Sequence, residues 1–133
     1  MKRLLSILLA SAGCAFAGPN VRVSIDGQGK GVGLVAQAYD VRLRNIPGIV
    51  VVPFGEPADL VIQLSCLIPR AENKDIGYVW AEVALDAKTG AELQGPSIFT
   101  VGPNYRDIVE GATSNVLALD RSVLSGWRGQ TNN

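Results

Sequence analysis

Two apolar runs on either side of a short breaker most restrict how this chain can fold. The runs are Ile49–Val52 and Leu60–Ile68, and Pro53, Gly55 and Pro57 lie between them. Both runs are rich in β-branched residues and are bounded by turn formers, a pattern that predicts buried strands. One side of the second run is entirely apolar: Leu60, Ile62, Leu64, Cys66 and Ile68. We expect the rest of the chain to cover this pair.

Three further segments alternate in the manner of half-buried strands. They are Asn20–Asp26, Ile76–Asp86 and Ala91–Val101, and a hairpin turn at Asp86–Gly90 joins the last two. Pro96 predicts a sheet edge or a bulge in the third segment, because proline cannot donate a ladder hydrogen bond.

Two segments have the apolar period of amphipathic helices, Val32–Arg44 and Asn104–Trp127. Gly111 should weaken the second helix by about 1 kcal/mol relative to alanine. A glycine-rich stretch, Gly27–Gly33, precedes the first helix, but its spacing matches neither phosphate-binding motif, so we interpret it as a flexible connection.

The resulting element order is β-α-β-β-β-β-α. The strands are expected to form one sheet, and the two amphipathic helices must bury their apolar faces against it. This predicts an α/β (α+β) two-layer sandwich. We expect a mixed four- to five-stranded sheet with both helices on one face. The first strand–helix–strand unit should place its two strands parallel.

The first 17 residues have the features of a cleaved signal peptide. Lys2–Arg3 is basic, Leu4–Ala10 begins an apolar stretch, and Ala15–Ala17 is a small-x-small cleavage site. We expect residues 18–133 to form a single globular domain that is periplasmic or secreted.

Cys14 leaves an alternative open. Ser11–Cys14 resembles the lipobox of bacterial lipoproteins, although Ser11 stands where that motif usually has an aliphatic residue. Lipidation of Cys14 would make the protein an outer-membrane-anchored lipoprotein, and only then would it associate with a membrane.

Composition argues against several classes of activity. The 133 residues contain 12 basic and 12 acidic residues and no histidine. The sequence has no basic patch of the kind that binds nucleic acid. Histidine, the commonest general base and metal ligand, is missing. Cys66, the one cysteine after residue 17, belongs to an apolar row and is predicted to be a core residue. We expect no metal and no cofactor.

The two-layer arrangement leaves one sheet face uncovered, and this face is the candidate partner-binding surface. The residues assigned to it are Gln63, Ser65, Tyr78, Trp80 and Glu82. Aromatic residues beside polar groups suit protein contacts, and Trp80→Ala is then expected to weaken binding without unfolding the domain. The competing interpretation is that the aromatic residues pack under a loop or at the sheet edge.

The stretch Pro57–Ile62 followed by the hairpin Asp86–Gly90 resembles bacterial envelope domains of the TolB amino-terminal and curli-export lipoprotein kind. That resemblance extends over about residues 45–101. It implies an envelope interaction domain and no catalytic residue.

Three functions are consistent with these features. The first is a non-catalytic interaction domain of the cell envelope, whose partner is an envelope protein or another copy of the chain. The second is a lipid-anchored accessory subunit of an envelope assembly or transport complex. The third is a small carboxylate-dependent enzyme, for which Asp26 and Asp59 would have to approach each other.

Cleavage after Ala17 and lipoprotein processing before Cys14 predict different mature chains. When the protein is exported by a bacterial host, intact-mass spectrometry should give a chain that begins at Gly18, because Ala15–Ala17 fits ordinary signal peptidase. A lipid-modified chain that begins at Cys14, and loses its membrane association in Cys14→Ser, would support the lipoprotein instead.

Overall fold

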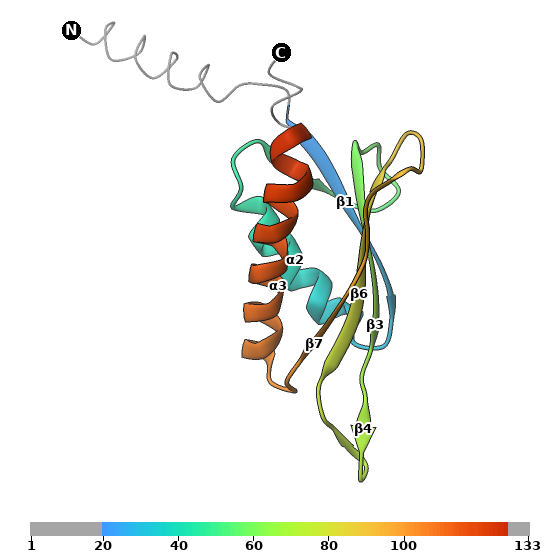
Figure 1. Ribbon diagram of the computed structural model, residues 1–133, viewed down its shortest axis with the longest axis vertical. Coiled ribbons are helices and arrows are strands. Elements are labelled where there is room, and N and C mark those ends of the chain that lie inside the picture. Colours follow the sequence, from blue (N-terminus) through green and yellow to red (C-terminus); the bar gives the residue numbers. More distant parts are fainter. Residues whose placement is uncertain (1–19, 128–133) are drawn as a thin grey trace, which may run out of the picture.

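Residues 20–127 are described by a computed structural model, in which one five-stranded sheet packs against two helices (Figure 1). The sheet strands are β1 (Val21–Gly29), β2 (Ile49–Val52), β3 (Leu60–Leu67), β6 (Tyr78–Asp86) and β7 (Glu92–Val101). The helices are α2 (Val32–Arg44) and α3 (Tyr105–Leu119), and the latter continues into a π-helical turn, η1 (Asp120–Leu124). The predicted α/β two-layer sandwich, with both helices on one face, is confirmed.

The strands lie in the order β2-β1-β3-β6-β7. Strand β1 pairs parallel with both β2 and β3, whereas β3 with β6 and β6 with β7 are antiparallel. The sheet is therefore mixed, as expected, and the parallel pairing around α2 is confirmed. Strand β7 lies at one edge, and its pairing with β6 shifts between Glu82 and Ala84, close to Pro96.

The segment after β3 forms a small hairpin. Its strands are β4 (Arg70–Ala71) and β5 (Lys74–Asp75), which extend beyond the main sheet (Figure 1). Glu72 and Asn73 both have positive φ, the conformation of a two-residue turn whose twist matches the flanking strands.

The glycine-rich connection is explained by close packing. A side chain at Gly29 would collide with the backbone carbonyl of Cys66, and one at Gly31 would lie 2.9 Å from the Tyr78 ring. Both residues also have positive φ, which glycine adopts without strain. The stretch thus lets the chain turn tightly against β3 before α2 begins.

A single apolar core fills the space between the helices and the sheet. Cys66 lies within it at 6% exposure, which confirms the predicted core role, and burial raises the pKa of its thiol. The other large contributors are fully buried: Tyr39 and Leu43 of α2, Leu60, Ile62 and Leu64 of β3, Trp80 of β6, and Ile108 and Leu119 of α3.

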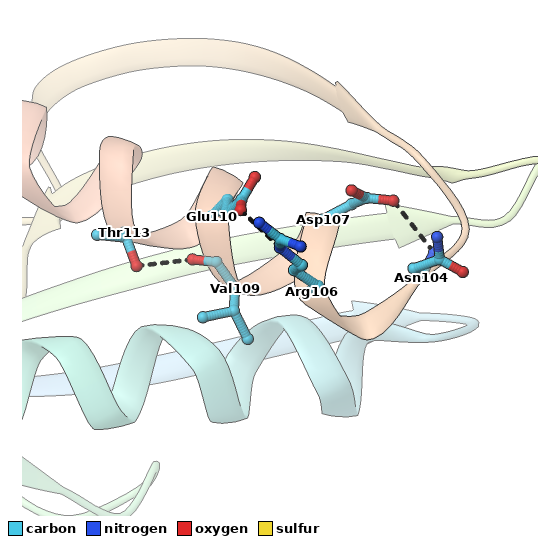
Figure 2. A network of polar contacts seen from close by, with 6 residues as sticks. All are labelled: Asn104, Arg106, Asp107, Val109, Glu110 and Thr113. Carbon is cyan, nitrogen blue, oxygen red and sulfur yellow. Dashed lines mark hydrogen bonds and ion pairs between the residues drawn. The ribbon is translucent and has the colours of Figure 1, made fainter.

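Helix α3 begins where the sequence predicts (Figure 2). The Asp107 carboxylate accepts a hydrogen bond from the backbone N–H of Asn104 at 3.3 Å, as part of a capping box. Arg106 in the first turn forms an exposed ion pair with Glu110 in the next turn at 3.0 Å, which adds little stability. Local signals in the sequence therefore fix the start of the helix.

Gly111 has a packing role that outweighs its low helix propensity. A Cβ at this position would lie 2.8 Å from a Val101 methyl group and 3.2 Å from the Trp80 ring. The absence of a side chain therefore allows α3 to approach β6 and β7 closely.

We expect Gly111→Ala to lower the free energy of unfolding by about 1–3 kcal/mol, because overpacking exceeds the gain in helix propensity. The matched control is Gly33→Ala in α2, where nothing lies within 4 Å of the added methyl group. That variant should gain up to about 1 kcal/mol. Urea denaturation measures both, and a more stable Gly111→Ala would contradict this account.

Candidate functional site

The face of the sheet opposite the helices is largely open and mostly apolar. Cross-strand register places alternate residues of β3, β6 and β7 on it. We call these residues the uncovered face: Val61, Gln63, Ser65, Leu67, Val79, Ala81, Val83, Leu85, Ile98 and Thr100. The most accessible large side chains among them are Ile98, 74% exposed, and Leu67, 56% exposed. None of the ten residues is charged.

Two of the five residues assigned to this face from the sequence do lie on it. Gln63 and Ser65 are exposed beside Leu67, as predicted. Trp80 and Glu82, in contrast, are 0% and 2% exposed and point into the core, so their assignment to the surface is wrong.

Register explains the error on β6. Trp80 is paired with Cys66, and Glu82 with Leu64, which places both beside the apolar row of β3. Tyr78 is on the same side as Trp80 and is half-buried. The alternative row, from Val79 to Leu85, is apolar throughout and had the pattern of a core row, yet it forms the middle of the uncovered face.

A buried polar cluster explains why the less apolar row turns inward. The Tyr39 hydroxyl of α2 donates a hydrogen bond to Glu82 Oε1 at 2.6 Å and accepts one from Trp80 Nε1 at 3.0 Å. The Tyr39 and Trp80 rings also meet edge to face, with centroids 6.4 Å apart. One hydroxyl thus satisfies the polar atoms of two core residues.

The environment of this cluster favours neutral groups. Burial raises the pKa of the Glu82 carboxyl above its ordinary value of 4.5, and the hydrogen bond from Tyr39 opposes that rise. Burial, followed by the charge of Glu82, raises the pKa of Tyr39 far above 10.0. The buried Asn115 of α3 acts in the opposite direction on Tyr39, although its Nδ2 makes no hydrogen bond.

The cluster is structural in character. Its three hydrogen-bonded residues are at most 2% exposed, so a substrate could not reach the carboxyl. None of the ion pairs within residues 20–127 involves Glu82, and no second acid lies in the hydrogen-bonded set. A buried acid that accepts a hydrogen bond from a tyrosine contributes to packing and specificity here.

The carboxylate pair required by the enzyme hypothesis does not form. Asp59 accepts a hydrogen bond from the backbone N–H of Arg22 at 2.9 Å, next to the start of the β1–β3 pairing. Asp26 lies four residues further along β1, which is about 13 Å along a strand.

Two open grooves border the sheet. One, of about 380 Å³, lies between α2 and β2, and its one acidic residue, Asp40, is paired with Arg44 at 2.8 Å. The other, of about 360 Å³, lies beside the β2–β3 loop and has Glu56 as its one acid. Neither groove brings together two acids or an acid and a nucleophile activated by a base.

Residues 20–127 also offer no cluster of three or more metal-ligating side chains. The helices within this range are too short or too polar to cross a membrane.

Comparison with known proteins identifies the fold. No family model matches the sequence, and no curated protein matches it. Among solved structures, TolB from Acinetobacter baumannii aligns over 77% of this chain with a TM-score of 0.57 and 11% identity. The aligned part is 28% of TolB, so this chain corresponds to a fraction of that protein.

Two other solved structures align over most of their own length. Protein XCC0632 from Xanthomonas campestris covers 87% of this chain and is itself covered to 88%, with a TM-score of 0.52 and 9% identity. A PelC dodecamer from Paraburkholderia phytofirmans covers 77% and is covered to 87%, with a TM-score of 0.50 and 14% identity. The resemblance to TolB-type envelope domains is confirmed at the level of the fold.

The raised pKa of Glu82 predicts how stability depends on pH. Because the fold favours the protonated acid, its contribution is complete below about pH 4.5 and is lost as pH rises through the raised folded value. Glu82→Gln keeps an acceptor for Tyr39 and does not ionise. Relative to the unmodified chain, the variant should therefore become more stable as pH rises from 4 to 8, by about 1–3 kcal/mol.

Urea denaturation at several pH values measures this difference. Glu56→Gln, on an exposed loop, is the control for the loss of one negative charge. If both variants change equally with pH, burial of Glu82 does not destabilise its ionised form.

Proposed function

We propose that residues 18–133 form a non-catalytic interaction domain of the bacterial cell envelope, exported by the signal segment at residues 1–17. The fold shared with TolB and PelC supports this proposal. The domain acts by holding a protein partner, and the polar cluster stabilises the fold that presents the contact surface.

The observation that carries this proposal is the uncovered face. Its centre is the row Val79, Ala81, Val83 and Leu85 of β6, and Leu67 and Ile98 rise on either side. Antiparallel sheets commonly leave one face to solvent, but the residues of such a face are then mostly polar. A contiguous apolar row on an open sheet is typical of a contact surface.

The chemistry of the face indicates what it binds. Its ten residues are uncharged, and the charges beside them on this side of the sheet are acidic: Asp26 of β1 lies opposite Gln63, and Glu92 of β7 lies opposite Leu85. Recognition at the centre of the face therefore depends on shape and apolar area. Gln63 and Ser65 add hydrogen-bonding groups beside Leu67. The partner that fits is a folded protein with an apolar, weakly charged patch, and nucleic acids are unsuited to it.

Self-association is a second candidate. PelC, one of the structures with the same fold, forms a dodecamer. The partner in this case is another copy of the chain.

The uncovered face is tested by one substitution on each side of the molecule. Leu67→Glu places a charge on the face, and Leu117→Glu places the same charge on the outer side of α3, at similar exposures of 56% and 46%. In a crosslinking pull-down from the native envelope, Leu67→Glu should reduce the captured partner at least about tenfold, since an uncompensated charge in an apolar contact is costly. Leu117→Glu should capture the partner normally.

Equal capture by the two variants would show that the uncovered face is not the contact surface. Both variants alter exposed residues, so both should keep the melting temperature of the unmodified chain within a few degrees.

A further inference from the structure

The outer edge of β7 is the one long sheet edge that the structure leaves unpaired. Within residues 20–127, β7 has a single strand neighbour, β6. Its second half, Ser97–Val101, lies between Pro96 and the pair Gly102-Pro103, and we call these five residues the edge segment. Alternate residues of an edge strand direct their backbone N–H and C=O groups outward, where another strand can bind.

The two edges of the sheet differ in how they are protected. Strand β2, at the opposite edge, has four residues and is followed directly by Pro53. The first half of β7 contacts η1, where Ser122 Oγ donates a hydrogen bond to Gln94 at 2.9 Å. The edge segment is flanked by Pro96 and Pro103, but its own five residues include no proline and form no hydrogen bond with a helix of residues 20–127, and no charged residue occurs from Leu93 to Tyr105. Charged side chains are the usual protection of an exposed edge.

We infer that the edge segment pairs antiparallel with the same segment of a second copy of this chain. The prolines at each end leave five residues free to pair, so the register that uses all of them is centred on Phe99. Ile98 of one copy then lies opposite Thr100 of the other, and Ser97 opposite Val101. Cross-strand pairs of β-branched residues are favourable, and the neutral segment brings no like charges together.

A second copy suits this edge better than an unrelated strand. The segment is complementary to itself about Phe99, whose ring packs 5.9 Å from Trp80 and is half-buried. In the dimer, the two Phe99 residues meet on the helix side of the sheet and cover each other. The edge segment has no charged residue, so it does not favour a strand of opposite charge over a second copy of itself.

This pairing has a geometrical consequence. Antiparallel pairing of two identical edges has a two-fold axis perpendicular to the sheet, so the helices of both copies lie on the same side. The two uncovered faces then become one continuous surface. The inference goes beyond the proposed function, because it uses the backbone edge of β7 and not the side chains around Leu67.

Sedimentation of the processed protein over a micromolar-to-millimolar series tests the pairing through its register. The unmodified chain should form dimers. Ile98→Glu should raise the dimer Kd about tenfold by removing two β-branched pairs. The double variant Ile98→Glu with Thr100→Lys places opposite charges across both pairs and should restore the Kd to within about threefold. The control Ile98→Lys with Thr100→Lys should dissociate further.

A chain that is monomeric across the series overturns the inference, and so does equal behaviour of the two double variants. Leu67→Glu separates this surface from the proposed one. It should leave the dimer intact while reducing capture of the envelope partner as proposed above, whereas loss of the dimer in Leu67→Glu would assign self-association to the uncovered face. Because Ile98 is 74% exposed, its variants should remain folded, as circular dichroism will confirm.

Discussion

The hydroxyl of Tyr39 connects the helix layer to the sheet, and the orientation of β6 depends on it. It accepts the indole N–H of Trp80 and donates to the Glu82 carboxyl, at 3.0 and 2.6 Å. Without such a partner, an acid at 2% exposure would cost several kcal/mol, and the strand would be better placed with its other row inward. The cluster therefore decides which side of β6 meets the helices.

The orientation of β6 also determines which residues lie on the face of the sheet away from the helices. Successive residues of a strand point to opposite faces, so the inward orientation of Trp80 and Glu82 directs Val79, Ala81 and Val83 outward. The apolar surface is thus a direct consequence of a polar contact in the core. Gly111 completes the arrangement, because it lets α3 approach the ring of Trp80. The fold and the candidate contact surface share one set of interactions.

Most of the fold could be predicted from local patterns. The run Leu60–Ile68 has one wholly apolar row, and the structure buries its members within β3, Leu60, Ile62, Leu64 and Cys66, as expected. Asn104 and Asp107 mark the start of α3 for reasons that lie within one helical turn. Pro96 indicated an edge strand, and β7 is at the edge of the sheet. In each of these places, the residues that decide the structure are close in sequence.

The candidate site was harder to predict because β6 has two plausible rows. Its orientation is set by a hydrogen bond between residues 43 positions apart, which no periodicity reveals. The one available signal was the tyrosine on the apolar side of the predicted helix, since a buried tyrosine hydroxyl needs a partner. Gln63 and Ser65 were placed correctly because β3 has no such ambiguity.

The two halves of the sheet differ in how well they are shielded from contact with other chains. Strand β2 is short and ends at a proline, and the neighbouring residues Ser24 and Val52 are buried although their register places them on the side away from the helices. In the β3–β6–β7 half, the centre of the face and the edge segment of β7 are uncharged, and Glu92 at the start of β7 is the nearest acid on that strand. Natural sheets tend to place charges on surfaces that must remain free. The neutral centre of this half, combined with the protection of the other, is why both proposed contact surfaces lie on the β3–β6–β7 side of the domain.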